Sequence, residues 1–128
     1  MRTIITYGTF DLFHEGHVNL LARAKALGDR LIVGCSTDEF NEQKEKKSFI
    51  PYSSRAKILS ACRYVDVVIP EDSWEQKVSD ISLYEVDCFV MGSDWKGRFD
   101  FLLPYCEVVY LERTPDISTS YIKKALGS

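Results

Sequence analysis

The stretch TIITYGTFDLFHEGHVNLLARAKALGDRLIVGC, residues 3–35, decides the fold. It opens with one apolar run, Thr3–Tyr7, and closes with another, Leu31–Cys35, each as long as a buried strand. Between them, Val18–Leu27 is predicted to be a helix, because its apolar residues recur on one face and Gly28 supplies a stop signal. This order predicts two parallel strands joined by a crossover helix.

The rest of the chain repeats the alternation. Three more apolar runs are predicted to be strands: Val65–Ile69, Cys88–Met91 and Val108–Leu111. Helices that begin at polar N-caps are predicted at Ser53–Tyr64, Trp74–Tyr84 and Ser118–Leu126. We therefore expect a single domain over residues 1–128, a doubly wound, Rossmann-like α/β fold with a parallel five-stranded sheet and helices on both faces.

The segment Asp38–Pro51, DEFNEQKEKKSFIP, departs from this pattern. It is highly charged from Glu42 to Lys47 and has little apolar periodicity, so we expect an exposed, mobile excursion after the second strand. Ligands of open α/β sheets bind beyond the carboxyl ends of strands, where its lysines can reach them. In an extended segment Lys44 and Lys46 would point to opposite sides and contact different groups.

Composition excludes several classes of protein. A net charge of −3 argues against a general nucleic-acid binder, which needs clustered basic residues. No apolar run approaches the roughly 20 residues of a membrane span, and the N-terminus lacks a signal peptide's apolar region, so we expect a cytoplasmic protein without a membrane partner. Four widely spaced cysteines among apolar neighbours are predicted to be buried free thiols: Cys35, Cys62, Cys88 and Cys106.

The motif GTFDLFHEGH, Gly8–His17, connects the first strand to the first helix. Gly8 permits close approach of a ligand to the backbone, and the helix start offers free N–H groups, so the turn is a predicted phosphate site. His14 and His17, three residues apart, can converge on one phosphate. A capping role is the simpler alternative for either histidine. The spacing does not suit zinc, and no P-loop is present in the sequence.

A second motif, RTPDISTS, spans Arg113–Ser120. Hydroxyl groups and free N–H groups at the start of the last predicted helix can form another anion cradle. On the residues alone, a helix cap is the favoured interpretation of this serine-rich start.

The pattern T-F-D-x-x-H-x-G-H, residues 9–17, resembles the signature of the HxGH nucleotidyltransferases. The whole chain is similar to the bacterial glycerol-3-phosphate cytidylyltransferases, and the likeness includes Ser36–Asn41, Arg63–Asp66, Trp74–Lys77, Val90–Trp95 and Ile117–Thr119. The resemblance implies transfer of CMP from CTP to sn-glycerol 3-phosphate, giving CDP-glycerol and pyrophosphate for a cell-surface polymer of the teichoic acid or capsule type.

The resemblance also implies roles for individual residues. It assigns catalysis to His14, His17 and Lys46, and acceptor binding to Lys44 and Lys77. It assigns nucleotide binding to these histidines and Lys46, together with Thr9, Phe10, Arg63, Asp94, Arg113, Thr114, Ile117, Ser118, Thr119 and Ser120. On sequence alone, Arg63 could be a helix C-terminal cation and Lys77 a surface residue. Pro115 and Asp116 stand where the family usually carries Glu-Gly.

Other implications concern the metal and the partners. Mg²⁺ is expected to bridge the substrate phosphates and to need few protein ligands, because it retains waters. The chain is expected to form a homodimer, as the resembling family does. Alternatives remain for the reaction: the acceptor could be another polyol phosphate, phosphocholine or phosphoethanolamine, or the donor could be ATP. A nucleotide-binding regulator without turnover is the alternative outside enzymes.

Overall fold

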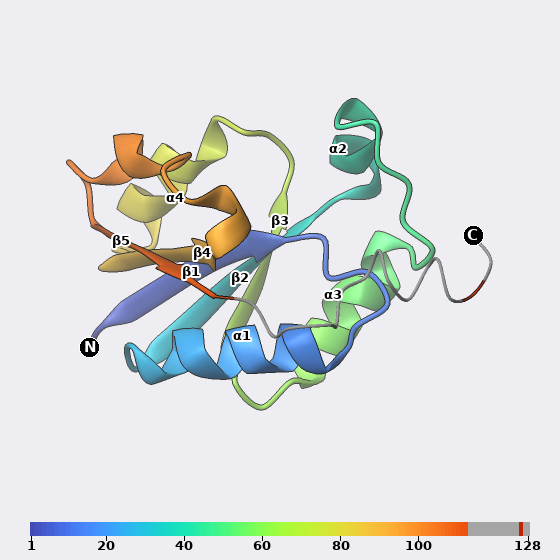
Figure 1. Cartoon of the computed structure of the whole chain (residues 1–128), viewed down its shortest axis with the longest axis horizontal. Coiled ribbons are helices and arrows are strands. Elements are labelled where there is room, and N and C mark those ends of the chain that lie inside the picture. The colour runs from blue at the N-terminus through green and yellow to red at the C-terminus, as the bar shows by residue number, and fades with distance from the viewer. Residues whose placement is uncertain (113–125, 127–128) are drawn as a thin grey trace.

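The computed structural model describes residues 1–112 and Leu126 (Figure 1). Its elements are β1 (Thr3–Gly8), α1 (Glu15–Ala26), β2 (Arg30–Ser36), α2 (Asp38–Gln43), α3 (Tyr52–Ala61), β3 (Val67–Glu71), α4 (Gln76–Leu83), β4 (Cys88–Gly92) and β5 (Glu107–Leu111), with two 3-10 turns, η1 (Ser93–Trp95) and η2 (Asp100–Leu102). All five predicted strands are confirmed, the third displaced by two residues. The predicted helix Ser118–Leu126 lies outside the described residues apart from Leu126.

The described residues form one sheet of five parallel strands in the order β3-β2-β1-β4-β5. The central strand β1 pairs with β2 through Ile5 and Ile32, and with β4 through Ile5 and Phe89. The chain builds outward from β1 in one direction and then in the other, so the strand order reverses between β1 and β4. Ligands of doubly wound sheets bind in the crevice at such a point.

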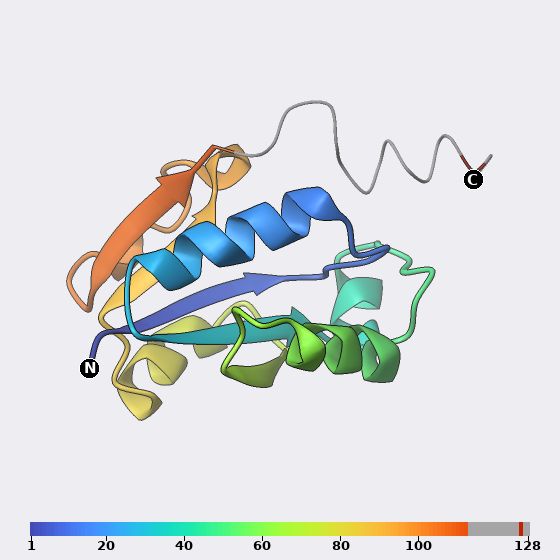
Figure 2. The ribbon, with the colours of Figure 1, turned by 90° about the horizontal axis from the view of Figure 1, so that it is seen from below.

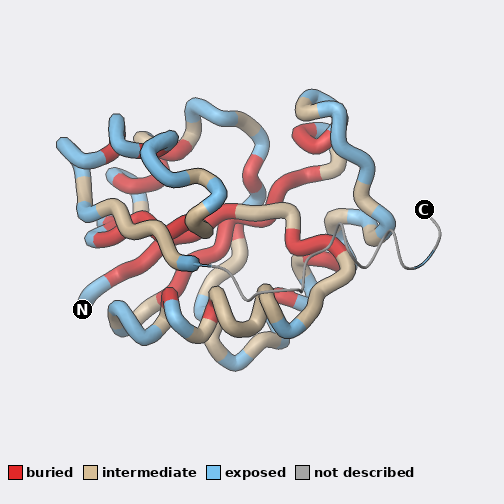
Figure 3. Tube along the Cα trace, in the orientation of Figure 1, coloured by how far each residue is buried: buried red, intermediate tan, exposed pale blue. Residues whose placement is uncertain are grey.

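Helices cover both faces of the sheet. Helices α1 and α3 lie on one face, as Figures 1 and 2 show, and α4 lies on the other with the 3-10 turns. Successive strand residues alternate between the two cores: Ile4 packs with Leu21 and Leu59 under α1 and α3, whereas Ile5 packs with Ile81 on the α4 side. Figure 3 shows the buried trace following the strands. The predicted doubly wound fold is therefore confirmed.

The segment after β2 corrects the sequence prediction. Its first half is the helix α2, and Phe40 within it is only 1% exposed. The Thr37 hydroxyl caps this helix by accepting a hydrogen bond from Phe40 N at 3.1 Å, and Asp38 and Glu39 add favourable charge to its first turn. A helix this short shows too little periodicity to be recognised. Whether the following loop is mobile stays a prediction.

The starts of two later helices also differ from prediction. Helix α3 begins after Pro51 rather than at a serine cap, and Tyr52 N donates to the Asp38 carboxylate at 3.0 Å. Helix α4 begins at Gln76, after Glu75, without a side-chain cap. Asp38, which caps the start of α3, lies 14 residues before Tyr52 in the sequence. A prediction from neighbouring residues alone therefore places the start of this helix wrongly.

Two smaller expectations can be compared directly. The four cysteines, all within the described residues, are free, but only Cys35 and Cys88 are buried, whereas Cys62 and Cys106 are partly exposed. Burial raises the pKa of Cys35 and Cys88 to about 11. Within residues 1–112 and at Leu126, the structure contains no helix with the length and apolar character needed to span a membrane.

Candidate active site

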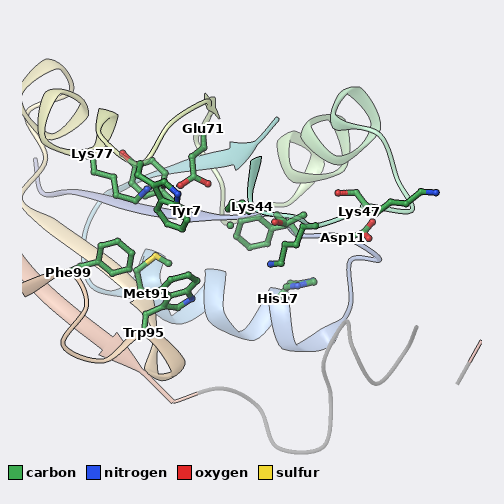
Figure 4. A pocket seen from close by; sticks show the side chains of 16 residues that line it. Tyr7, Asp11, His17, Lys44, Lys47, Glu71, Lys77, Met91, Trp95 and Phe99 are labelled. Carbon is green, nitrogen blue, oxygen red and sulfur yellow. Dashed lines mark hydrogen bonds and ion pairs between the residues drawn. The ribbon is translucent and has the colours of Figure 1, made fainter. Parts of the chain in front are cut away.

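A pocket of about 260 Å³ opens at the carboxyl ends of the central strands. Its lining comes from the turn after β1, the first turn of α1, the loop after α2, and the ends of β3 and β4 with the residues that follow them (Figure 4). The lining residues are Tyr7, Gly8, Thr9, Phe10, Asp11, His17, Lys44, Lys46, Lys47, Ser48, Glu71, Trp74, Lys77, Met91, Trp95 and Phe99. This is the crevice that the strand order predicts.

The turn after β1 is held in an unusual conformation. Phe10 and Leu12 have φ values of 54° and 50°, in the left-handed region that side chains rarely adopt. A Cβ on Gly8 would meet the Phe10 ring at 2.8 Å, so Gly8 makes room for that ring. The Asp11 carboxylate fixes the turn to the loop after α2 by accepting hydrogen bonds from Phe49 N (2.9 Å) and Ile50 N (3.0 Å). Asp11 is thus a structural carboxylate.

The two histidines form the start of α1 together. His14 is the N-cap, and its Nδ1 accepts a hydrogen bond from Gly16 N at 3.0 Å. His17 Nδ1 accepts in return from His14 N at 3.2 Å, which completes a reciprocal capping box. The two rings stack with centroids 3.9 Å apart. The capping alternative and the phosphate-binding hypothesis are therefore compatible, because capping uses only Nδ1.

This arrangement sets the protonation state of both rings. Burial, with a smaller contribution from the neighbouring His14, lowers the pKa of His17 to about 4, and Asp11 acts in the opposite direction. Burial also lowers the pKa of His14. A neutral imidazole whose Nδ1 accepts a hydrogen bond carries its proton on Nε2. At neutral pH each histidine therefore keeps an Nε2–H donor, and His17 presents its ring to the pocket.

Arg55 of α3 is a site residue that the sequence analysis missed. Its side chain is 1% exposed, and it donates to Thr9 O (3.0 Å), Ser36 O (2.7 Å) and Ile50 O (2.8 Å). It also forms an ion pair with Asp38 at 2.7 Å. Arg55 therefore ties the ends of β1 and β2 to α2 and its loop. Its place one turn before Leu59, on the buried face of the predicted helix, was the available signal.

Three lysines of the loop after α2 line the pocket, including Lys44 and Lys46. The expected extended segment is wrong, because Lys44 ends α2 and Glu45 has a φ of 56°. Both lysines consequently line the same pocket rather than opposite sides. The Lys44 ammonium lies 4.5 Å from the centroid of the Phe40 ring, and burial lowers the pKa of Lys44.

Lys77 of α4 is buried at the pocket, not on the surface. Its Nζ lies 2.7 Å from the Glu71 carboxylate, and both side chains are almost fully enclosed. The rings of Tyr7, Trp74 and Phe99 surround the same ammonium, as Figure 4 shows for Tyr7 and Phe99. A buried ion pair that lines a pocket is a candidate binding group.

The structure brings most of the described site residues together. Thr9, Phe10, His17, Lys44, Lys46 and Lys77 line the pocket, and His14 stacks on His17. Asp94 is exposed in η1, and the lining includes its neighbour Trp95 instead. The remaining predicted residues lie outside the described part of the chain: Arg113, Thr114, Ile117, Ser118, Thr119 and Ser120, with Pro115 and Asp116 between them.

Arg63 is a described residue that the structure places away from the pocket. It is exposed in the connection that follows α3, three residues before Asp66. The Asp66 carboxylate accepts from Leu31 N at 2.7 Å, at the start of β2, and from Lys25 Nζ at 2.6 Å. This connection therefore lies at the amino-end edge of the sheet, opposite the pocket.

The donor set does not favour a metal bound by protein carboxylates. No group of three or more His, Cys, Asp or Glu side chains within residues 1–112 could hold a metal ion. At the pocket, Glu71 is paired with Lys77, and both Asp11 oxygens accept backbone hydrogen bonds. These residues fit a metal ion that is carried by ligand phosphates.

Comparisons with known proteins agree with this geometry. The cytidylyltransferase-like family model matches residues 5–125. The chain is 62% identical to the glycerol-3-phosphate cytidylyltransferase of Bacillus spizizenii, over 100% of this chain and 99% of the relative. It is 56% identical to that of Staphylococcus aureus, over 98% and 96%. A lipopolysaccharide core biosynthesis protein from Thermoplasma volcanium GSS1 has the same fold, with a TM-score of 0.77 at 23% identity over 89% of this chain and 98% of that one.

Proposed function

The chain belongs to the cytidylyltransferase-like family, and we propose that it transfers CMP from CTP to sn-glycerol 3-phosphate, releasing CDP-glycerol and pyrophosphate. The relatives that match nearly the whole chain are glycerol-3-phosphate cytidylyltransferases. The observation that carries the proposal is the pairing of His14 and His17 as neutral donors beside a pocket lined by Lys44, Lys46 and Lys77. Such a pocket suits two phosphorylated substrates.

In the proposed reaction a phosphate oxygen of the acceptor attacks the α-phosphorus of CTP. A new P–O bond forms as the bond to pyrophosphate breaks, and pyrophosphate leaves with the electron pair. The attacking oxygen is already anionic, so no protein nucleophile or base is needed. Catalysis consists of positioning and of stabilising developing charge, to which His14 and His17 contribute Nε2–H donors and Lys46 contributes its ammonium.

The acceptor phosphate would bind between Lys44 and Lys77. Their ammonium groups lie 5.6 Å and 5.1 Å from the centroid of the Trp74 ring, so they share one aromatic neighbour. Burial lowers the pKa of Lys44, Glu71 partly opposes this, and the charges of Lys46 and Lys77 lower the pKa further. A phosphate dianion between these cations would relieve their repulsion and form charge-assisted hydrogen bonds.

Mg²⁺ would enter with the triphosphate and neutralise part of its charge. It would be held by phosphate oxygens, because the carboxylates of the pocket are engaged by Lys77 and by backbone N–H groups. The chain's own contribution is therefore the histidine pair and the lysines.

The proposal is tested by measuring pyrophosphate release from CTP and Mg²⁺ with a panel of phosphorylated alcohols. We expect sn-glycerol 3-phosphate to support turnover far better than its enantiomer or other polyol phosphates. CTP should be preferred over UTP if Asp94 accepts a hydrogen bond from the cytosine amino group. Equal rates with UTP would remove Asp94 from that role, and no turnover with any acceptor would favour a nucleotide-binding regulator.

The proposal extends to the setting of the enzyme. We infer a cytoplasmic homodimer that supplies CDP-glycerol for a cell-surface polymer, as the sequence resemblance implies. Exposed apolar side chains such as Phe101 and Leu103, both 57% exposed, could contribute to subunit contacts. Sedimentation at micromolar concentration should give the mass of two chains, and a monomer would contradict this part of the proposal.

A further inference from the structure

The Lys77 ammonium lies inside an aromatic cage, which we define as the rings of Tyr7, Trp74 and Phe99 with the Glu71 carboxylate. The Nζ atom lies 4.6 Å, 5.1 Å and 5.7 Å from the three ring centroids and 2.7 Å from Glu71. All three rings are close enough for cation–π attraction. Lys77 is 1% exposed, so its charge is almost fully transferred from water to the cage.

Ring faces around an anionic group are the chemistry that proteins use to bind free ammonium ligands, including quaternary ones. Here the cation is supplied by the chain itself. The cage also opens to the substrate pocket, since its three rings, Glu71 and Lys77 all line that pocket. Trp74 is the most exposed of the three rings, at 44%, whereas Tyr7 and Phe99 are buried.

The walls of the cage are held independently of Lys77. The Tyr7 hydroxyl donates to Asp80 at 2.7 Å, and Gln76 Nε2 donates to the same carboxylate at 2.9 Å. Phe99 packs against Phe89, with ring centroids 5.0 Å apart. Removal of the lysine side chain should therefore leave a preformed cavity rather than a collapsed one.

We propose that Lys77 acts as a tethered cation that closes this cage to the ammonium groups of amino-alcohol phosphates. The chain then accepts phosphorylated alcohols whose other groups are uncharged hydroxyls. An ammonium ligand at this end would lack the ring faces and would also face two fixed cations, because Lys44 lies on the same Trp74 ring. This specificity role rests on the proposed cytidylyl transfer.

The first test measures binding without turnover. Trp74 and Trp95 are the two tryptophans of the sequence, and both line the pocket, so tryptophan fluorescence reports occupancy. Tetramethylammonium is titrated into the wild type, Lys77→Ala and Lys77→Met. We expect saturable binding to Lys77→Ala that is at least tenfold tighter than to the other two, because Met removes the charge but still fills the cage. Equal binding to the Ala and Met variants would overturn the proposal.

A second variant guards against misfolding. Lys77→Ala leaves the Glu71 carboxylate buried without its partner, which can destabilise the fold. The double variant Lys77→Ala with Glu71→Gln removes both charges and keeps the three rings. It should unfold at a temperature closer to that of the wild type and should still bind tetramethylammonium more tightly than the wild type does. Failure of this folded variant to bind would overturn the proposal even if the single variant does not fold.

The final test measures specificity. For each protein, kcat/KM is compared for phosphocholine and sn-glycerol 3-phosphate, with CTP as donor. Opening the cage should shift this ratio toward phosphocholine by roughly 10-fold or more, the size expected for one cation–π site. An unchanged ratio would overturn the proposal. If the wild type used no acceptor at all, the proposed function would fail, whereas the tetramethylammonium titration would still decide the role of Lys77.

Discussion

Two buried cations lie on opposite faces of the sheet, and they differ in what their hydrogen-bond donors do. Arg55, on the β2 side, directs its guanidinium to the Thr9, Ser36 and Ile50 carbonyls and to Asp38. Lys77, on the α4 face, donates a hydrogen bond to Glu71 and lies among ring faces at the pocket. Equal burial therefore hides different roles.

The comparison separates a scaffold side from a ligand side of the site. The donors of Arg55 form hydrogen bonds within the chain, so its substitution should mainly lower the free energy of unfolding. The donors at or near the pocket belong to Lys77, Lys44 and the histidine pair. Substitution of these residues should mainly change kcat or KM. Whether the donors of a buried cation are all used by the chain, rather than how deeply the cation is buried, predicts whether its role is structural or ligand-binding.

The largest expected effect tests the scaffold side. Arg55→Met should lower the free energy of unfolding by about 3 to 5 kcal/mol, because three backbone carbonyls and Asp38 lose their donor. Urea denaturation measures the change. Arg63→Met is the matched control: this arginine is exposed at the opposite edge, so its loss should cost within about 0.5 kcal/mol.

Equal destabilisation by Arg55→Met and Arg63→Met would break the comparison. The Arg63 variant also tests the role that the resemblance assigns to it. An unchanged KM for CTP would agree with its distance from the pocket, whereas a raised KM would mean that Arg63 reaches the nucleotide in another way.

The fold was predictable because its signals are local. Each strand is a short apolar run, and the strands buried on both faces need no partner to be recognised. The errors fall where distant residues decide. The start of α3 depends on Asp38, and α2 depends on burying Phe40 under Trp74, with ring centroids 5.3 Å apart.

The candidate site was predictable only in part for the same reason. His14 and His17 stand out because a motif of ten residues contains them both. Arg55 was missed because its partners come from three separate segments. Its spacing from Leu59 indicates burial but does not identify those partners. The enclosure of Lys77 likewise arises from β1, the segment before α4 and the segment after β4, which only the folded chain brings together.

The histidine pair gives the next largest effect and sharpens the ligand side. His14→Ala and His17→Ala should each lower kcat by about 10²–10³-fold, the usual consequence of losing one transition-state donor. Each also removes part of the capping box, which costs about 1 kcal/mol of stability. Steady-state kinetics on folded protein separates the two effects.

His14→Asn is the matched control for the capping role. Its side-chain oxygen can still accept from the first turn of α1, but it lacks the Nε2–H donor. We expect near wild-type stability with the same loss of kcat as in His14→Ala. Recovery of kcat in the Asn variant would mean that His14 acts only as a cap.

The loop lysines should give a smaller effect. Lys44→Ala is expected to raise the KM for the acceptor about tenfold, since one charge-assisted contact is lost, while Lys46→Ala should mainly impair the use of CTP. Lys57→Ala, on α3 and away from the pocket lining, is the control. Identical kinetic changes in the two loop variants would contradict the assignment of Lys44 to the acceptor and Lys46 to CTP. The test is stringent because both lysines line the same pocket.

The smallest expected effect is a dependence of stability on pH. It tests the comparison of the two sides, because it would give His17, a residue of the ligand side, a role in stability. Burial lowers the pKa of His17 to about 4 in the folded chain, below the ordinary value near 6.5 that it takes when unfolded. As the pH falls below 6.5, the unfolded chain binds a proton that the folded chain excludes, so stability falls until pH 4. Between pH 7 and pH 5.5 the loss of stability from His17 should be about 1 kcal/mol.

His17→Asn cannot titrate in this range, so urea denaturation at the two pH values should show a smaller loss of stability in this variant. His14 acts in the same direction and is present in both proteins, so the difference between them isolates His17. Equal losses in both would show that His17 is not buried as a neutral ring, and its assignment as a neutral donor would fail with it.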